Sequence, residues 1–194
     1  MLKICSPTYQ FYDKLGARIS IRRMTLDDKA HMIQLYHNMS ADSLYQRFHT
    51  SVHGLDANSI SREADKLIYL PNDHGRGWLA FDAQNNNEAN WPVIGGMRVV
   101  YDNLPDRTTA EFSTAVRDDY HGRHIGSELL NYACDQAERL GIEKIHASVL
   151  PENTPMLQTF RKLPYAITYD QNETDDLVTI HLGDKKGWLL EGII

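Results

Sequence analysis

The sequence predicts a mixed α/β fold of the α+β type, in which helices flank a mostly antiparallel central sheet. Two observations predict it. Apolar residues recur at helical spacing from about residue 32 to about residue 67 and then follow strand patterns from residue 78 to residue 116. A helical segment, 128–140, then lies between strand segments 110–116 and 144–150. Such a connection places its two strands parallel through a right-handed crossover, so we expect one parallel β-α-β unit.

Caps and periodicity define the first elements. Alternating residues 18–22 predict a strand. Thr25 stands before acidic residues at the start of an apolar helical pattern that runs to about residue 38, which is typical of an N-cap. Ser40 begins a second short helix, and Asn58 is a candidate cap for a third helix over about 61–67.

Strand patterns dominate the rest of the chain. A polar loop at 82–90 separates two hairpin strands, and Gly141 ends the clearest helix. The expected strands are 78–81, 93–101, 110–116, 144–150 and 177–182, and the expected helices are 128–140 and 154–163.

Length and charge restrict the class of protein. The 194 residues, 42% of them hydrophobic, suit a single domain over 17–182, with an arm at 1–16 and an apolar tail at 183–194. A net charge of -6 argues against nucleic-acid binding. No segment approaches the roughly 20 apolar residues of a membrane span. Two distant cysteines and a start without a long apolar run predict a reduced, cytoplasmic protein.

The segment from strand 110–116 into helix 128–140 carries the candidate chemistry. It contains a glycine-bearing turn, His121-Gly122-Arg123-His124-Ile125-Gly126. Backbone N–H groups of such a turn and of the following helix N-terminus can bind an anion such as phosphate. An ordinary strand-to-helix connection has the same outline, and geometry alone leaves both interpretations open. The spacing fits neither a dinucleotide-binding Gly-x-Gly-x-x-Gly motif nor a Walker loop.

At these six residues the sequence resembles the GNAT N-acetyltransferase superfamily, whose acyl-CoA loop reads Arg/Gln-x-x-Gly-x-Gly/Ala. His121 and His124 depart from that pattern. Residues 150–157, with Asn153 at the CoA-contacting asparagine, are also similar to the family. The string Met39-Ser40-Ala41-Asp42-Ser43-Leu44-Tyr45-Gln46-Arg47-Phe48 resembles the acetyltransferase domains of bacterial protein-lysine acetyltransferases. The likeness covers about residues 17–182.

The resemblance implies a set of site residues. Glu111 matches the glutamate taken as the general base, although an exposed glutamate on a half-solvated strand is the alternative. A tyrosine acid of many relatives is replaced by Phe160, so we assign no acid, and we expect Tyr165 and Cys134 in the core. A bulge is expected near residues 114–116. The implied cofactor-binding residues are Thr114, Ala115, Val116, His121, Gly122, Arg123, His124, Ile125, Gly126, Ser127 and Asn153.

The resemblance implies an N-acetyltransferase that uses acetyl-CoA and a primary amine, either a small molecule or a protein lysine, in one ternary complex. Its rivals are a non-catalytic acyl-CoA-binding regulatory domain and a fold that only mediates protein contacts. We expect no metal, because the pairs His121/His124 and His49/His53 lack a third ligand in sequence. Arg47 is left as either an acceptor-groove or a packing residue. The sequence is compatible with a homodimer.

Overall fold

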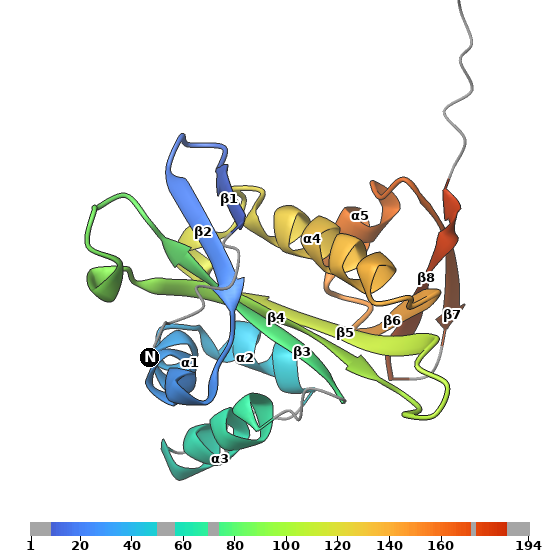
Figure 1. Cartoon of the computed structure of the whole chain (residues 1–194), viewed down its shortest axis with the longest axis horizontal. Coiled ribbons are helices and arrows are strands. Elements are labelled where there is room, and N and C mark those ends of the chain that lie inside the picture. The colour runs from blue at the N-terminus through green and yellow to red at the C-terminus, as the bar shows by residue number, and fades with distance from the viewer. Residues whose placement is uncertain (1–8, 50–56, 70–73, 172–173, 186–194) are drawn as a thin grey trace, which may run out of the picture.

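The computed structural model describes residues 9–49, 57–69, 74–171 and 174–185. Across these residues the chain forms an eight-stranded sheet in the order β1-β2-β3-β4-β5-β6-β8-β7 (Figure 1). Neighbouring strands are antiparallel except β5 and β6, which are parallel. The predicted sheet with one parallel unit is therefore confirmed. The strands are β1 (Tyr9–Tyr12), β2 (Arg18–Arg23), β3 (Gly75–Asp82), β4 (Val93–Tyr101), β5 (Thr109–Val116), β6 (Lys144–Val149), β7 (Tyr165–Gln171) and β8 (Asp176–Lys185).

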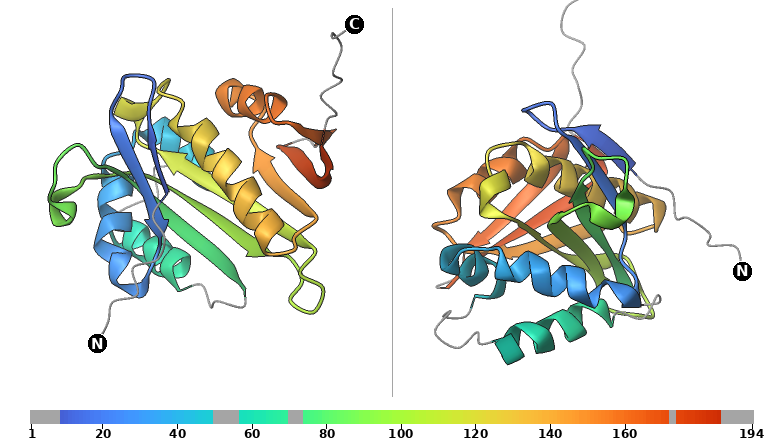
Figure 2. Two further views of the ribbon diagram at one scale, coloured as in Figure 1. Left: turned by 45° about the horizontal axis from the view of Figure 1, so that its top comes forward. Right: turned by 90° about the vertical axis from the view of Figure 1, so that its left-hand side faces the viewer.

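Helices cover both faces of the sheet (Figures 1 and 2). One face carries α1 (Lys29–His37), α2 (Ala41–Phe48) and α3 (Ala57–Ile68). The other face carries α4 (Ile125–Arg139) and α5 (Thr154–Arg161). Short 3-10 turns occupy Leu26–Asp28, Glu88–Asn90 and Asp118–Tyr120.

The central strand β5 contributes to a separate core on each face. Phe112 belongs to the core beneath α4 and α5, whereas Ala115 belongs to the core beneath α1, α2 and α3. Successive strand residues face opposite sides, so Glu111 and Ser113 share the Ala115 face. The sequence pattern of β5 thus fixes which candidate residues face which layer of helices.

Two predicted helices begin earlier than the sequence indicated. α4 was predicted from 128 but begins at Ile125, directly after the left-handed His124, and it ends before Gly141 at φ +76°. α3 begins at Ala57, so Asn58 lies within the helix and does not cap it. Ser40 does cap α2, because its hydroxyl accepts a hydrogen bond from the Ser43 N–H.

Both edges of the sheet differ from the prediction. The sequence assigned residues 1–16 to an arm outside the domain, but Tyr9–Tyr12 forms edge strand β1. It also missed β7 at the opposite edge, and β8 continues to Lys185, into the predicted tail. Each edge strand buries few side chains, so neither shows the alternation that reveals a strand. Residues 186–194 of that tail lie outside the described residues.

Candidate functional site

The parallel strands β5 and β6 separate after a short contact. They pair only over residues 109–111 of β5, although both strands continue. β5 stays paired with β4 as far as Val116, and β6 stays paired with β8 as far as Val149. Each strand therefore follows the twist of its own half of the sheet, and the halves diverge beyond Glu111.

The divergence involves no bulge in β5. Its register with β4 runs without a shift from Ala110 to Val116, so the bulge predicted near residues 114–116 is wrong. The opening instead arises because each of the two strands keeps its other neighbour.

The opening between the two strands contains a cavity of about 320 Å³. Glu111 and Ser113 line it from one face of β5, and Phe112 and Thr114 line it from the other. The cavity therefore extends through the gap between the strands toward both faces of the sheet. Its remaining lining residues are Gln46, Arg47, Phe48, His49, Ala147, Ser148, Val149, Asn153 and Met156.

The glycine-bearing turn leads from β5 into α4 with two left-handed residues. Gly122 has φ +70° and His124 has φ +67°. The first bond of the helix runs from the Glu128 N–H to the His124 carbonyl, at 3.1 Å. The preceding amides, Ile125 to Ser127, form the helix N-terminus, where the dipole favours an anion. The structure thus brings these predicted loop residues together in the geometry of an anion site.

Two side chains of this turn form contacts with other residues of the protein. His121 Nε2 lies 2.8 Å from the Val116 carbonyl oxygen. The Arg123 guanidinium pairs with the buried Asp13 carboxylate and stacks over the Tyr120 ring, at 4.3 Å from its centroid. Burial of Asp13 is outweighed by its hydrogen bonds, among them the one from Arg123, so the pKa of its carboxyl is lowered. Both side chains are thus engaged within the protein, and the backbone N–H groups of the helix N-terminus are the candidate anion-binding groups of the turn.

Helix α2 is tied to the same turn by Asp118. This carboxylate accepts hydrogen bonds from the Ser40 N–H at 2.8 Å, the Ser40 hydroxyl at 2.6 Å and the Ser43 hydroxyl at 2.8 Å. Burial alone would raise the pKa of the Asp118 carboxyl. The hydrogen bonds from both serines and the charge of His121 outweigh it, so the pKa is lowered. The Ser-x-x-Ser part of the predicted motif thus anchors one wall of the cavity to the turn.

Asn153 and Thr114 also line the cavity. The Asn153 side-chain oxygen accepts the Met156 N–H at 3.2 Å and caps α5, which leaves its amide nitrogen as a donor. The Thr114 hydroxyl donates to the Gly96 carbonyl at 3.0 Å. Of the predicted cofactor residues, these two contact the cavity, whereas His121 to Ser127 lie at the turn.

The predicted core positions of Tyr165 and Cys134 are confirmed. Phe160, which stands where many relatives have the tyrosine acid, is completely buried and meets Phe112 edge to face. Tyr165 is buried, and its hydroxyl donates to Glu138 at 3.3 Å. Burial raises the pKa of the Cys134 thiol to about 12. The cysteine is therefore a poor nucleophile at neutral pH.

Sequence reasoning missed two residues beside the site, Arg98 and Tyr36. Arg98 lies on β4 opposite Ser113, and Tyr36 is buried on α1. The available signal was a lone charged residue within the otherwise apolar strand 93–101. The role of Arg98 could not be predicted, because only the tertiary fold brings Arg47 of α2 close to it.

Within the described ranges, the structure contains no group of three or more His, Cys, Asp or Glu side chains arranged to hold a metal. None of the helices in those ranges combines the length and the apolar character needed to span a bilayer.

Comparison with known families agrees with this geometry. Residues 41–165, more than half of the chain, match the acetyltransferase (GNAT) family. The chain therefore belongs to the GNAT acetyltransferases, a family that uses acetyl-CoA as co-substrate.

Several solved structures share the fold. The GNAT domain of PAT from Streptomyces lividans superposes with a TM-score of 0.74 at 20% identity, over 90% of this chain and 96% of that one. Ribosomal-protein-S5-alanine acetyltransferase from Vibrio fischeri gives 0.64 at 11% identity, over 90% and 95%. The cAMP-binding acyltransferase from Mycobacterium smegmatis gives 0.58 at 21% identity, over 91% of this chain but 47% of its own length.

Proposed function

We propose that the protein transfers an acetyl group from acetyl-CoA to a primary amine in a ternary complex, with Glu111 as the general base. The observation that carries this proposal is the cavity at the point where β5 and β6 diverge, with Glu111 at the last paired position. A cofactor bound at the α4 turn and an amine entering from the α2 side would meet there.

The cofactor half of the proposal rests on backbone groups. The Arg117 N–H donates to Ile94 of β4, at 2.9 Å. Because alternate strand residues direct their backbone groups to the same side, those of Thr114 and Val116 point toward the open edge. An extended pantetheine chain would pair with this edge like an added strand, with its pyrophosphate at the amides of Ile125 to Ser127.

The acceptor half requires a base. A lysine-like amine has a pKa of about 10.4, so its neutral form costs about 4.6 kcal/mol at pH 7. The Glu111 carboxylate would remove this proton, directly or through water. The amine then attacks the thioester carbonyl, an amide C–N bond forms, the C–S bond breaks, and the second amine proton passes to the departing sulfur or to water. CoA leaves as a thiolate, which is stable enough to depart at neutral pH without a tyrosine acid.

The test is Glu111→Gln. Loss of the base should lower kcat by about 10²- to 10⁴-fold, while acetyl-CoA binding stays within about twofold, because the side chain contacts the amine and not the cofactor. Turnover is measured as CoA release over a panel of amines, and binding as the thermal shift.

Glu143→Gln is the matched control, because Glu143 is an exposed glutamate outside the cavity. Unchanged turnover in Glu111→Gln would reject the base assignment. Acetyl-CoA binding without turnover by the wild type over the whole panel would favour the non-catalytic acyl-CoA-binding domain.

A further inference from the structure

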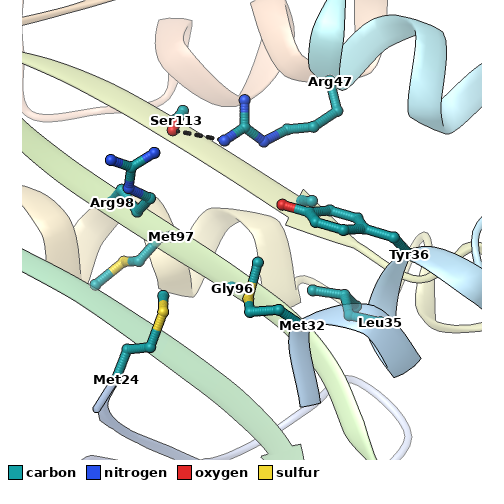
Figure 3. Close-up of a pocket in the computed structure, with 10 residues that line it drawn as sticks. Met24, Met32, Leu35, Tyr36, Arg47, Gly96, Met97, Arg98 and Ser113 are labelled. Carbon is teal, nitrogen blue, oxygen red and sulfur yellow. Dashed lines mark hydrogen bonds between the residues drawn. The ribbon is translucent and has the colours of Figure 1, made fainter. Parts of the chain in front are cut away.

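Two arginines converge beside the proposed base. Arg47 of α2 and Arg98 of β4 both direct their guanidinium groups toward Ser113 of β5 (Figure 3). An Arg47 nitrogen donates to the Ser113 hydroxyl at 3.1 Å, and Arg98 stands opposite Ser113 in the β4–β5 register. The Tyr36 hydroxyl points into the same space (Figure 3).

No carboxylate forms an ion pair with either arginine within the described part of the chain, although the charge of Glu111 acts on Arg98. Among the same described residues, Arg98 Nε is buried without a hydrogen-bond partner. Burial and the charge of Arg47 lower the pKa of Arg98 and outweigh the opposite effects of Tyr36 and Glu111, although an arginine remains charged at neutral pH. Burial raises the pKa of Tyr36, so its phenol stays neutral. A buried donor of this kind costs stability unless a ligand satisfies it.

The cation pair lies beside the proposed reaction site. Arg47 and Ser113 line both the 320 Å³ cavity and a recess of about 10 Å³ that Arg98 and Tyr36 also line. Such a recess admits about one water-sized atom. It therefore suits one oxygen of an anion whose remaining atoms stay in the cavity.

We propose that Arg47 and Arg98, with Ser113, form a carboxylate-binding subsite, so that one of the two substrates carries a carboxylate. This inference rests on the proposed acyl transfer, because the separation between the subsite and Glu111 sets how far the carboxylate lies from the reacting amine. Ser113 follows Glu111 by two strand residues, or about 7 Å. Guanidinium groups bind carboxylates through paired, charge-assisted hydrogen bonds, and a planar carboxylate matches their geometry.

Either of the two substrates can carry the carboxylate. It belongs either to the amine acceptor, as in an ω-amino acid, or to the acyl chain, as in a dicarboxylic acyl-CoA. The amine and carboxylate of an extended δ-aminovalerate lie about as far apart as Glu111 and Ser113 along the strand, whereas those of glycine are much closer together. Substrate pairs that differ only in the carboxylate separate the two sources.

The acceptor arm compares β-alanine, γ-aminobutyrate and δ-aminovalerate with alkylamines of the same length. The acyl arm compares succinyl-CoA with butyryl-CoA, an uncharged acyl group of the same length. Each pair is measured as kcat/KM and as the thermal shift of the protein, with CoA present in the acceptor arm so that binding is seen without turnover. We expect a preference of about 10- to 100-fold for the carboxylate form in one arm.

Arg98→Met and Arg47→Gln should each remove most of this preference, and Arg139→Gln, at an exposed helix position, should keep it. Arg47→Gln serves if Arg98→Met fails to fold, because Arg47 is not in the sheet. A preference in neither arm, or one that survives both variants, overturns the subsite. A carboxylate-dependent thermal shift without any turnover keeps the subsite and rejects the proposed transfer. Turnover of amines without any carboxylate preference keeps the proposed transfer and rejects the subsite.

Discussion

His124 occupies the one position of the turn where the resembled family has its central glycine. Its φ of +67° lies in the left-handed region, which histidine tolerates better than most residues but which still strains a residue with a Cβ. Its side chain is exposed. The strain at His124 is therefore local, and the shape of the turn does not require the imidazole.

We expect His124→Gly and His124→Val to behave differently. Glycine relieves the strain but adds unfolded-state entropy, so the free energy of unfolding should change by less than about 1 kcal/mol. Valine, which is β-branched, should lower it by about 1–2 kcal/mol. Urea unfolding measures both. Acetyl-CoA binding should be retained in His124→Gly, and a tenfold loss would show that the imidazole itself contacts the phosphates.

The junction of β2 and α1 depends on a single buried carboxylate, Asp28. Its side chain is 3% exposed and accepts two hydrogen bonds from Arg22, at 2.9 and 2.7 Å. It also accepts the Thr25 N–H at 2.7 Å and faces His31 Nδ1 at 2.9 Å. Burial raises the pKa of Asp28, but the bonds from Arg22 and Thr25 outweigh it and lower the pKa to about 2.

A lowered pKa makes this junction sensitive to acid. Because the folded-state pKa lies below the unfolded value of 3.8, Asp28 contributes its full stabilisation above about pH 4 and loses it as pH falls toward about 2. Asp28→Asn should therefore cost about 2 kcal/mol at pH 7, and the difference from wild type should shrink as pH falls through that window. Urea unfolding at several pH values from 7 down to about 2 measures it.

Asp135→Asn is the control for this measurement. Asp135 pairs with Arg139 on the surface of α4 and is 51% exposed. Surface pairs contribute at most about 1 kcal/mol, so its removal should have little effect. A loss in Asp28→Asn that stays constant with pH would mean that packing, not ionisation, holds the junction.

Elements that bury a periodic apolar face could be predicted from sequence, and those that do not could not. β4 matched its predicted bounds because both its neighbours and both helical layers cover it. β1 and β7 lie at the edges and carry no such pattern. In the site, the turn was predicted because its candidate anion-binding residues are consecutive in sequence. The arginine pair was missed because Arg47 and Arg98 meet only through the packing of α2 on the sheet.

The whole sheet consists of two halves that meet over a short seam. β1 to β5 form one half, β6 to β8 form the other, and the seam pairs only residues 109–111 of β5 with β6. α4 packs mainly against β4 and β5. A ligand that fills the opening would add contacts across the seam, so it should stabilise the molecule as a whole.

We therefore expect acetyl-CoA to protect a defined set of amides from hydrogen exchange. A ligand at 100 times its Kd adds about 2.7 kcal/mol, which for a domain of this size raises Tm by roughly 5–10 °C. The local effect should concentrate at Thr114 and Val116, on the open edge, and at Ile125 to Ser127. Strands β2 and β3, which are fully paired within their own half, should respond only through global stability. NAD, a dinucleotide without pantetheine, is the control.

If acetyl-CoA protects the α4 turn but not β5, the cofactor is held by its phosphates alone and its thioester does not reach Glu111. Protection of β5 in addition would bring the thioester to the divergence point, where the proposed transfer requires it.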